Sequence, residues 1–363
     1  MEVGGTIPWM ESVESSLEQR PRKCREHVFE RRVIGEHHTI HYFTINYMLN
    51  HTIITGLLFV CSLQAQAGTF ALITNQGSDD VSIIDLEQNK TVATVPVGHR
   101  PAGIVVSNRD HRAYVTNPES KDVSVIDIKN REPIKTIPVG DGPLGIAMHP
   151  DGNEVYIADW YKHSVFILNT GKLEVTASIP VGHSPSGIAV SPDGLSMYVT
   201  NRDDNNVMHI NIPERKVIAT IEVGKAPFGI TISDSGDQVY VANVQSNDVS
   251  IIDTQTDAVI ETVKVGLFPY AIVHDQSRNR ILVTNQREND VSVIDLSNFT
   301  VIKRIATGEY PEGIDIHPSG KFVYVANWFD DTVSVIDLDT LEVVDEIATG
   351  KGSRAYGKFI YSN

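Results

Sequence analysis

The side chains best suited to ligand chemistry in this chain stand beside a proline that returns every 42 residues, from Pro101 to Pro311. In three successive repeats aromatic side chains flank this proline. The third of these repeats also has an acidic residue directly after the proline, and the next repeat has a basic residue at the equivalent position. Equivalent positions of a repeat are expected to surround one opening, and aromatic walls with a few charged groups are typical of a small-molecule pocket. The candidate ligand-binding residues are Phe228, Phe268, Tyr270, Tyr310, Glu312, Trp328 and Arg354, with Arg100 and His99 beside them.

Two interpretations of Glu312 and Arg354 follow from these positions. In the first, both side chains face a ligand together with the aromatic groups. In the second, they form an ion pair between neighbouring repeats while the aromatic groups close the opening. The first predicts that Tyr270→Ala and Trp328→Ala weaken ligand binding without loss of stability, whereas the second predicts a large loss of stability.

Motifs of the common catalytic and cofactor sites are missing from the sequence. The chain has no Gly-x-Ser-x-Gly elbow, no His-Glu-x-x-His motif, no phosphate loop and no dinucleotide fingerprint. His99 and His183 are equivalent positions two repeats apart, which is too far for ligands of one metal ion. The recurring aspartates, such as Asp85, end strand-like runs and suit turns in which a carboxylate accepts backbone N–H groups. No catalytic residue, metal ligand or cofactor is therefore assigned.

The elements that position these residues are set by a strict repeat. A glycine recurs seven times at intervals of 42 residues, from Gly98 to Gly350, without insertion or deletion. Each repeat holds four short runs rich in Val, Ile, Thr and Tyr, separated by Gly, Pro, Asn and Asp, which indicates strands and hairpin turns. Four strands in a period near 40 predict an all-β fold, a seven-bladed β-propeller with four-stranded blades.

The two ends of the repeat region predict how the ring closes. The first repeat begins with one strand, Phe70 to Asn75, and lacks a preceding inner strand. After Gly350 comes one more strand-like run, Arg354 to Tyr361. We therefore expect the C-terminal run to supply the inner strand of the blade that the N-terminal strands begin, which leaves no open sheet edge.

The phrases Tyr114-Val-Thr-Asn117, Tyr198-Val-Thr-Asn201 and Tyr240-Val-Ala-Asn243 resemble the repeats of the YVTN-repeat β-propellers. The resemblance covers residues 68–363. This family of exported bacterial and archaeal proteins includes surface-layer proteins, periplasmic propellers and propellers encoded beside quinone-dependent alcohol oxidation systems. Related seven-bladed folds serve as lactonases or hold cofactors such as haem d1, so the fold by itself does not choose a function.

Three functions are compatible with the residues and the resemblance. The first is an exported binding module that recognises a small molecule or an envelope protein, such as a quinoprotein dehydrogenase system, on its loop-rich channel face. The second is a lactonase- or lyase-type enzyme that uses Glu312, Arg354 and His99. The third is a passive component of the cell envelope or surface layer. The binding module is the preferred hypothesis.

The charge of the chain argues against binding to nucleic acid. The formal net charge is −16 at pH 7. Almost all of this negative charge falls on residues 68–363, because acidic and basic side chains nearly balance before them. An acidic surface repels phosphate backbones and anionic lipids.

The N-terminal part of the chain predicts export. Residues 48–67 contain an apolar run, Ile53 to Leu63, and end in the small-x-small site Ala65-Gln-Ala67, which is typical of a signal peptide cleaved between Ala67 and Gly68. Residues 1–47 have no repeat and are interpreted as a disordered segment from an upstream mis-start. The mature protein would then be periplasmic or secreted, with no stable membrane span.

An alternative keeps the long N-terminus as a signal anchor over Phe43 to Leu63, with the propeller outside the cell. Asn46, Asn50 and His51 make that stretch a poor span. Cys24 and Cys61, the two cysteines of the chain, would both be lost on cleavage, which excludes disulfides and thiolate chemistry from the mature protein.

Overall fold

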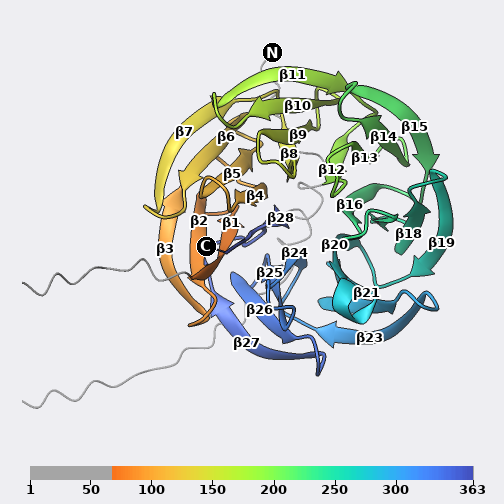
Figure 1. Cartoon of the computed structure of the whole chain (residues 1–363). Coiled ribbons are helices and arrows are strands. Elements are labelled where there is room, and N and C mark those ends of the chain that lie inside the picture. Colours follow the sequence, from red (N-terminus) through yellow and green to blue (C-terminus); the bar gives the residue numbers. More distant parts are fainter. Residues whose placement is uncertain (1–67, 363) are drawn as a thin grey trace, which may run out of the picture. The chain divides into compact units, whose positions relative to one another are not determined.

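The computed structural model describes residues 68–362, and these form a ring of seven β-sheets around a central channel (Figure 1). Almost no helix occurs in this part of the chain; one short 3-10 turn, η1, spans Gln276–Arg278. The predicted all-β, seven-bladed propeller with four-stranded antiparallel blades is confirmed. The interpretations placed on residues 1–67, including the mis-start, the signal peptide and the signal anchor, lie outside the described residues.

Six blades run from the channel to the rim in chain order, and in the seventh the C-terminal strand β29 lies inside β1, β2 and β3. The inner strands line the channel: β4 (Gly103–Ser107), β8 (Pro143–Met148), β12 (Pro185–Val190), β16 (Pro227–Ile232), β20 (Pro269–Asp275), β24 (Pro311–Ile316) and β29 (Ile360–Ser362). The second strands are β1 (Thr69–Asn75), β5 (Arg112–Asn117), β9 (Glu154–Asp159), β13 (Ser196–Asn201), β17 (Gln238–Asn243), β21 (Arg280–Asn285) and β25 (Phe322–Asn327).

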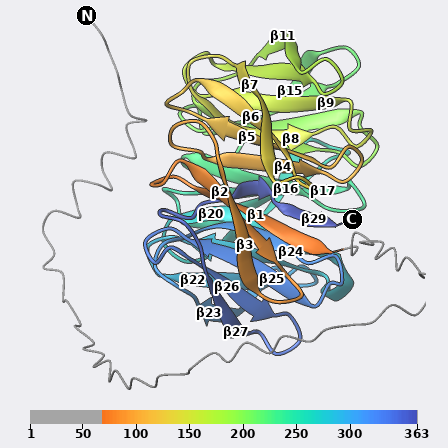
Figure 2. The same cartoon turned by 90° about the vertical axis from the view of Figure 1, so that its left-hand side faces the viewer.

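The remaining strands complete the blades. The third strands are β2 (Asp80–Asp85), β6 (Asp122–Asp127), β10 (Ser164–Asn169), β14 (Asn206–Asn211), β18 (Asp248–Asp253), β22 (Asp290–Asp295) and β26 (Thr332–Asp337). The outer strands, which form the rim of the disc in Figures 1 and 2, are β3 (Lys90–Pro96), β7 (Glu132–Pro138), β11 (Glu174–Pro180), β15 (Lys216–Glu222), β19 (Ala258–Lys264), β23 (Thr300–Ala306) and β27 (Glu342–Ala348).

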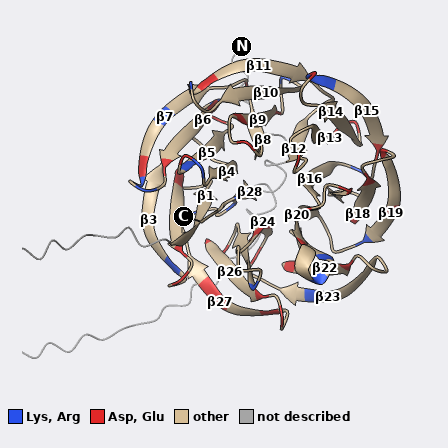
Figure 3. Ribbon diagram, in the orientation of Figure 1, with Lys and Arg blue, Asp and Glu red and all other residues tan. Residues whose placement is uncertain are grey.

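Burial explains the sequence of each strand. The third strands pack between neighbouring blades on both faces, so all but one residue of β6 is buried and the run is apolar apart from Ser124 and the terminal aspartates. In the outer strand β7 the side chain of Ile137 is buried while the residues before it are exposed. Charged residues accordingly gather on outer strands and loops, and the inner strands are mostly uncharged (Figure 3).

The asparagine of the Tyr-Val-Thr-Asn phrase fixes the turn between the second and third strands. The Asn117 side-chain amide donates to Asp122 Oδ1 at 2.6 Å and to Ser124 Oγ at 2.9 Å, and Asn75, Asn243 and Asn285 make the same pair of bonds in their blades. The amide N–H groups of these asparagines are thus satisfied within the turn, so the motif serves the blade.

The threonine of the same phrase joins one blade to the next. Thr200 Oγ1 accepts the Gly187 backbone N–H at 2.7 Å and donates to the Phe228 carbonyl of the following blade at 2.8 Å. Thr74, Thr116 and Thr284 make equivalent bonds. These hydrogen bonds link the inner strands of adjacent blades at equivalent residues along the channel axis.

The aspartates that end the third strands act as predicted. Asp85 Oδ1 accepts the backbone N–H groups of Glu87 and Gln88 at 3.0 and 3.1 Å, and Asp253 and Asp337 accept two such groups each. Their role as turn residues is confirmed, which removes this ring of carboxylates from the candidates for chemistry.

The ring closes in the blade that contains both β1 and β29. Ile360 pairs with Ala71, and the Arg354 N–H donates to the Thr74 carbonyl at 2.8 Å. The predicted closure is therefore confirmed, with one difference. Residues Tyr356–Lys358 leave this blade and form an additional strand, β28, which pairs in parallel with β4 inside the channel (Figure 1).

Candidate functional site

Three aromatic rings from different parts of the chain meet in the channel. The ring centroids of Phe228 and Tyr270 are 4.5 Å apart, and the Tyr356 ring lies 5.2 Å from the first and 5.6 Å from the second. The Tyr356 hydroxyl donates to the Phe228 carbonyl across the channel at 3.1 Å. All three side chains are buried. We call Phe228, Tyr270, Tyr356, Glu312 and Arg354 the plug.

The charged members of the plug form the ion pair of the second interpretation. Arg354 Nε lies 2.7 Å from Glu312 Oε2, and each side chain is 2% exposed. Arg354 Nη2 also donates to the Tyr270 hydroxyl oxygen at 2.6 Å, and the Gln286 amide donates to Glu312 Oε1 at 2.9 Å. Burial raises the pKa of Glu312 to about 7, although the Arg354 charge opposes the rise. Because both side chains are buried, Glu312 and Arg354 pair with each other inside the protein and do not face an open ligand site.

The local sequence explains why β28 turns into the channel. In an ordinary blade, Pro185 pairs with Asn201 and Ile188 with Val199. In the closing blade Ser353 bridges to Asn75, and the next paired residues are Ile360 and Ala71. The chain between Ser353 and Ile360 is therefore longer than the chain between Asn75 and Ala71 that it faces, and the additional residues must leave the blade. Gly357 allows this, because its φ is +128° and a Cβ there would overlap the Ile104 carbonyl oxygen.

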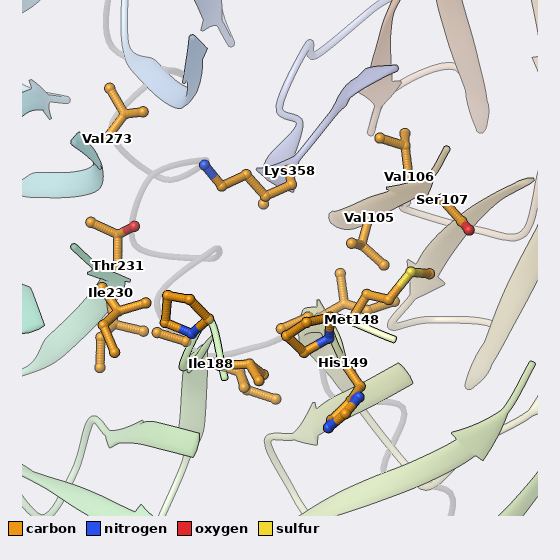
Figure 4. Close-up of a pocket in the computed structure, with 18 of the residues that line it drawn as sticks. Val105, Val106, Ser107, Met148, His149, Ile188, Ile230, Thr231, Val273 and Lys358 are labelled. Atoms are coloured by element: carbon orange, nitrogen blue, oxygen red, sulfur yellow. The ribbon is translucent and has the colours of Figure 1, made fainter. Parts of the chain in front are cut away.

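A cavity of about 590 Å³ lies in the channel, and Tyr356 is one of its lining residues. Figure 4 shows ten of the lining residues with labels. The walls of the cavity are side chains of the inner strands together with β28. They are largely aliphatic: Val105, Val106, Ile146, Ala147, Met148, Ile188, Ala189, Val190, Ile230, Ile232, Ala271, Ile272, Val273 and Ile314. Thr231 and Lys358 add polar groups to these walls.

The cavity opens on the face formed by the turns between inner and second strands, which we call the turn face. Its rim includes Asn108, Arg109, His149, Asp151 and Asp234. The opposite face, where outer strands lead into the next inner strand at the recurring glycines, we call the glycine face. The sequence analysis placed the ligand site at the glycine face, but none of its nine candidate residues is among those lining this cavity.

The other candidates lie around the plug and on the glycine face. Tyr310 packs on Trp328 and Phe329, with centroid distances of 5.6 and 5.0 Å. The Arg287 guanidinium lies 3.9 Å from the centroid of the Phe268 ring. Tyr310 is buried, while Phe268 and Trp328 are partly exposed.

His99 and Arg100 lie in another loop and contact acidic side chains there. His99 Nδ1 is 2.9 Å from Asp79 Oδ2, and this carboxylate raises the pKa of the histidine. Arg100 Nε is 3.3 Å from Glu119 Oε1. The His99 side chain is 73% exposed, whereas Glu312 and Arg354 are buried, so these three residues do not share one accessible surface.

Sequence analysis missed Tyr356, Gln286 and Lys358, which the structure brings into the channel. The available signal was in the C-terminal run. Its Tyr356-Gly-Lys358 departs from the Gly-Ile or Ala-Ile pair of the other inner strands, and a lysine in such a strand indicates contact with water.

Tyr270→Phe is expected to lower the free energy of unfolding by about 1.5–3 kcal/mol, because the buried Arg354 guanidinium loses its hydroxyl acceptor. Tyr161→Phe, at a position that is 39% exposed, is the matched control and should change stability by less than about 0.5 kcal/mol. Urea unfolding of the three proteins measures the difference. Equal midpoints for Tyr270→Phe and the parent would contradict a structural role for this hydroxyl.

Residues 68–362 contain neither a cluster of metal-binding side chains nor a helix suited to a membrane span. No group of three or more His, Cys, Asp or Glu side chains in this range could hold a metal ion. Within the same range there is no helix of the length and hydropathy that a membrane span requires.

Comparison with known proteins supports the fold. A model of YNCE-like beta-propellers matches residues 74–238, and a model of the cytochrome D1 heme domain matches residues 245–355. No curated protein matches the chain. A solved structure of Kuenenia stuttgartiensis hydrazine synthase is similar at 24% identity and a TM-score of 0.68, over 73% of this chain and 91% of that one.

Two further solved structures extend this similarity. A protein of unknown function from Desulfotomaculum acetoxidans has 15% identity and a TM-score of 0.69, over 79% of this chain and 99% of that one. Dihydro-heme d1 dehydrogenase NirN in complex with DHE has 18% identity and a TM-score of 0.61, over 76% of this chain and 63% of that one. The chain is thus a seven-bladed β-propeller similar in its two halves to YNCE-like propellers and to the cytochrome D1 heme domain.

Proposed function

We propose that this propeller is a binding module whose channel cavity holds a small organic molecule. The observation that carries the proposal is the cavity itself, which has a volume of about 590 Å³ and is lined by the inner strands and β28. Ligand sites are typically concave, mainly apolar and of this size, with a few polar groups that orient the ligand. The cavity has this size, and its lining combines aliphatic side chains with polar groups such as Thr231 and Lys358.

Binding is favoured over catalysis by the position of the ionisable groups. An enzyme of lactonase or lyase type needs an acid, a base or a metal at the substrate. Glu312 and Arg354 are buried in the plug, and His99 is exposed beside Asp79. The aliphatic walls of the cavity supply surface for contact, and at its rim His149 and Asp151 contact each other.

The proposal is tested by a thermal-shift screen of the purified protein against a library of small organic molecules. We expect some of these molecules to raise the melting temperature of the parent. Thr231→Trp, which fills part of the cavity, should abolish the shift, whereas Thr262→Trp, at an exposed position of β19, should preserve it. The absence of any stabilising compound, or a shift unaffected by Thr231→Trp, would contradict the proposal.

The similarity to the cytochrome D1 heme domain raises the question of whether the cavity could hold a haem. Haem iron takes His, Met, Tyr or Cys ligands, with Met acting beside His. Among the described residues that line the cavity, His149 has Nδ1 on Asp151 at 2.7 Å and Nε2 on the Gly194 carbonyl at 3.1 Å. The Tyr356 hydroxyl is bonded to the Phe228 carbonyl. These residues do not fit an iron ligand set, so no haem chemistry is derived.

We infer that the partner class to test first is an envelope redox system of the dehydrogenase type. Two of the similar solved structures are named hydrazine synthase and dihydro-heme d1 dehydrogenase, and the YVTN resemblance points to quinoprotein dehydrogenases. The partly exposed Phe268 and Trp328 on the glycine face are the surface proposed for this contact. A dehydrogenase that co-purifies with the parent protein from envelope extracts, and no longer co-purifies with Trp328→Ala, would support this contact. Equal co-purification with the parent and with Trp328→Ala would contradict the assignment of this surface.

Export is part of the proposed function, because the signal-peptide pattern ends next to the first blade strand. The native protein is expected to begin at Gly68, after cleavage behind Ala67. Edman sequencing and intact mass of protein from its natural source measure this directly. Detection of residues 1–47 on the mature protein would overturn it.

A further inference from the structure

We propose that the ligand of the channel cavity is an amphipathic organic anion, with its apolar body against the aliphatic walls and its carboxylate on Lys358. This inference rests on the proposed binding function and names the class of ligand.

Lys358 is the charged side chain that reaches over the middle of the cavity. It lies on β28, the extra strand inside the channel, and in Figure 4 its ammonium group extends away from β28 toward the side where Val273 lies. The lysine side chain is 67% exposed. A lysine ammonium has three donors, and a ligand that enters the cavity must meet them.

The acidic group beside Lys358 is already engaged by the backbone. Asp315 Oδ2 accepts the N–H groups of Phe359 and Ile360 at 2.9 and 3.0 Å, and Oδ1 accepts that of Ile316 at 3.0 Å. Its side chain is 6% exposed, and Oδ1 lies 3.7 Å from Lys358 Nζ, longer than a hydrogen bond. Asp315 therefore holds the closing strand in place and leaves the lysine donors available to a ligand.

The charged groups at the rim are engaged with one another or with solvent. Arg109 Nη1 donates to the Asp151 carbonyl and to Asn153 Oδ1, and the Asp151 carboxylate contacts His149. The Asp234 side chain is 60% exposed and lies 3.9 Å from His274. Of the charged side chains in the described lining, Lys358 is thus the one that we expect to meet the head group of a ligand.

The walls determine the rest of the ligand. Aliphatic side chains from six inner strands surround the space, and an uncharged polar molecule would lose hydrogen bonds to water without replacing them. A hydrocarbon body gains free energy from the same burial. A carboxylate brought to Lys358 replaces its lost hydration with a charge-assisted hydrogen bond, whereas an ammonium group would be repelled.

Octanoate, octanol and octylammonium share one tail and differ in head group, so they isolate the role of charge. Isothermal titration of the full protein at pH 7.5 should show octanoate binding about tenfold or more tightly than octanol, and octylammonium more weakly than either. Lys358→Met should remove the preference for octanoate by lowering its affinity to that of octanol, while Lys358→Arg preserves it. Lys351→Met, an exposed lysine on the glycine face, is the matched control and should behave as the parent.

Each outcome of this experiment decides one of the two proposals. Equal affinity of the parent for octanoate and octanol, or an octanoate preference that survives in Lys358→Met, overturns the assignment of an anion while leaving the cavity a binding site. Failure of all three molecules to bind the parent contradicts the cavity's role as an apolar binding site, on which this inference depends.

Discussion

Removal of residues 354–363 is expected to abolish the cooperative unfolding transition of the propeller. These residues contain β29, which pairs with β1, and they bury Arg354, Phe359 and Tyr361. Without them the backbone groups of β1 lose their partners and the adjoining blades lose an apolar contact surface. Because each blade is stabilised by its neighbours, the loss spreads beyond one blade.

Circular dichroism during heating measures this effect. Lys358→Ala, which alters an exposed side chain in the same segment, is the control and should retain the melting temperature of the parent. A truncated protein with an unchanged melting temperature would contradict the shared closing blade.

Arg354→Met is expected to lower the free energy of unfolding by about 3–5 kcal/mol at pH 8, because it leaves the buried Glu312 without its counter-ion. The double variant Arg354→Met, Glu312→Leu removes both charges and should be more stable than the single variant at this pH. Urea unfolding of the parent and both variants gives the comparison. Equal stability of the single variant and the parent at pH 8 would contradict an energetic role for this ion pair.

The same residues give a pH dependence of defined sign. The pKa of Glu312 is raised from 4.5 to about 7 in the folded protein by burial, so the folded state holds its proton more tightly than the unfolded state. Its contribution to stability is therefore full below pH 4.5 and is lost as the pH rises to about 7. In Arg354→Met this fall should extend to higher pH, since the opposing arginine charge is gone, and in the double variant it should disappear.

Ten residues at the C-terminus thus perform three tasks in one segment. β29 completes the blade of β1, Tyr356 and Arg354 complete the plug, and Lys358 supplies the charge in the cavity. Ring closure and the proposed binding site are coupled by this arrangement. Variants at Tyr356 should consequently be checked for folding before any change in binding is interpreted.

The sequence by itself determined the fold. The strict interval of 42 residues places Asn117, Asp127 and their equivalents at the same point of every blade, and local hydrogen bonds at the turns recur in most blades. Strand type and blade number follow from this regularity, because they depend on spacing and on neighbours in the chain. The pairing of β29 with β1 follows from the missing inner strand of the first repeat and the additional run after Gly350.

Only the tertiary structure decided what faces the channel. Phe228, Tyr270 and Glu312 share a repeat position with Ala102 and Ser186, and the sequence left open whether their side chains meet a ligand or one another. The answer depends on Tyr356 and Arg354, which reach them from a segment up to 128 residues away. Such contacts follow from closure of the ring and from the irregular register of the last strand. The sequence shows that Tyr356-Gly-Lys358 departs from the repeat, but the spacing of the repeat does not predict where these residues go.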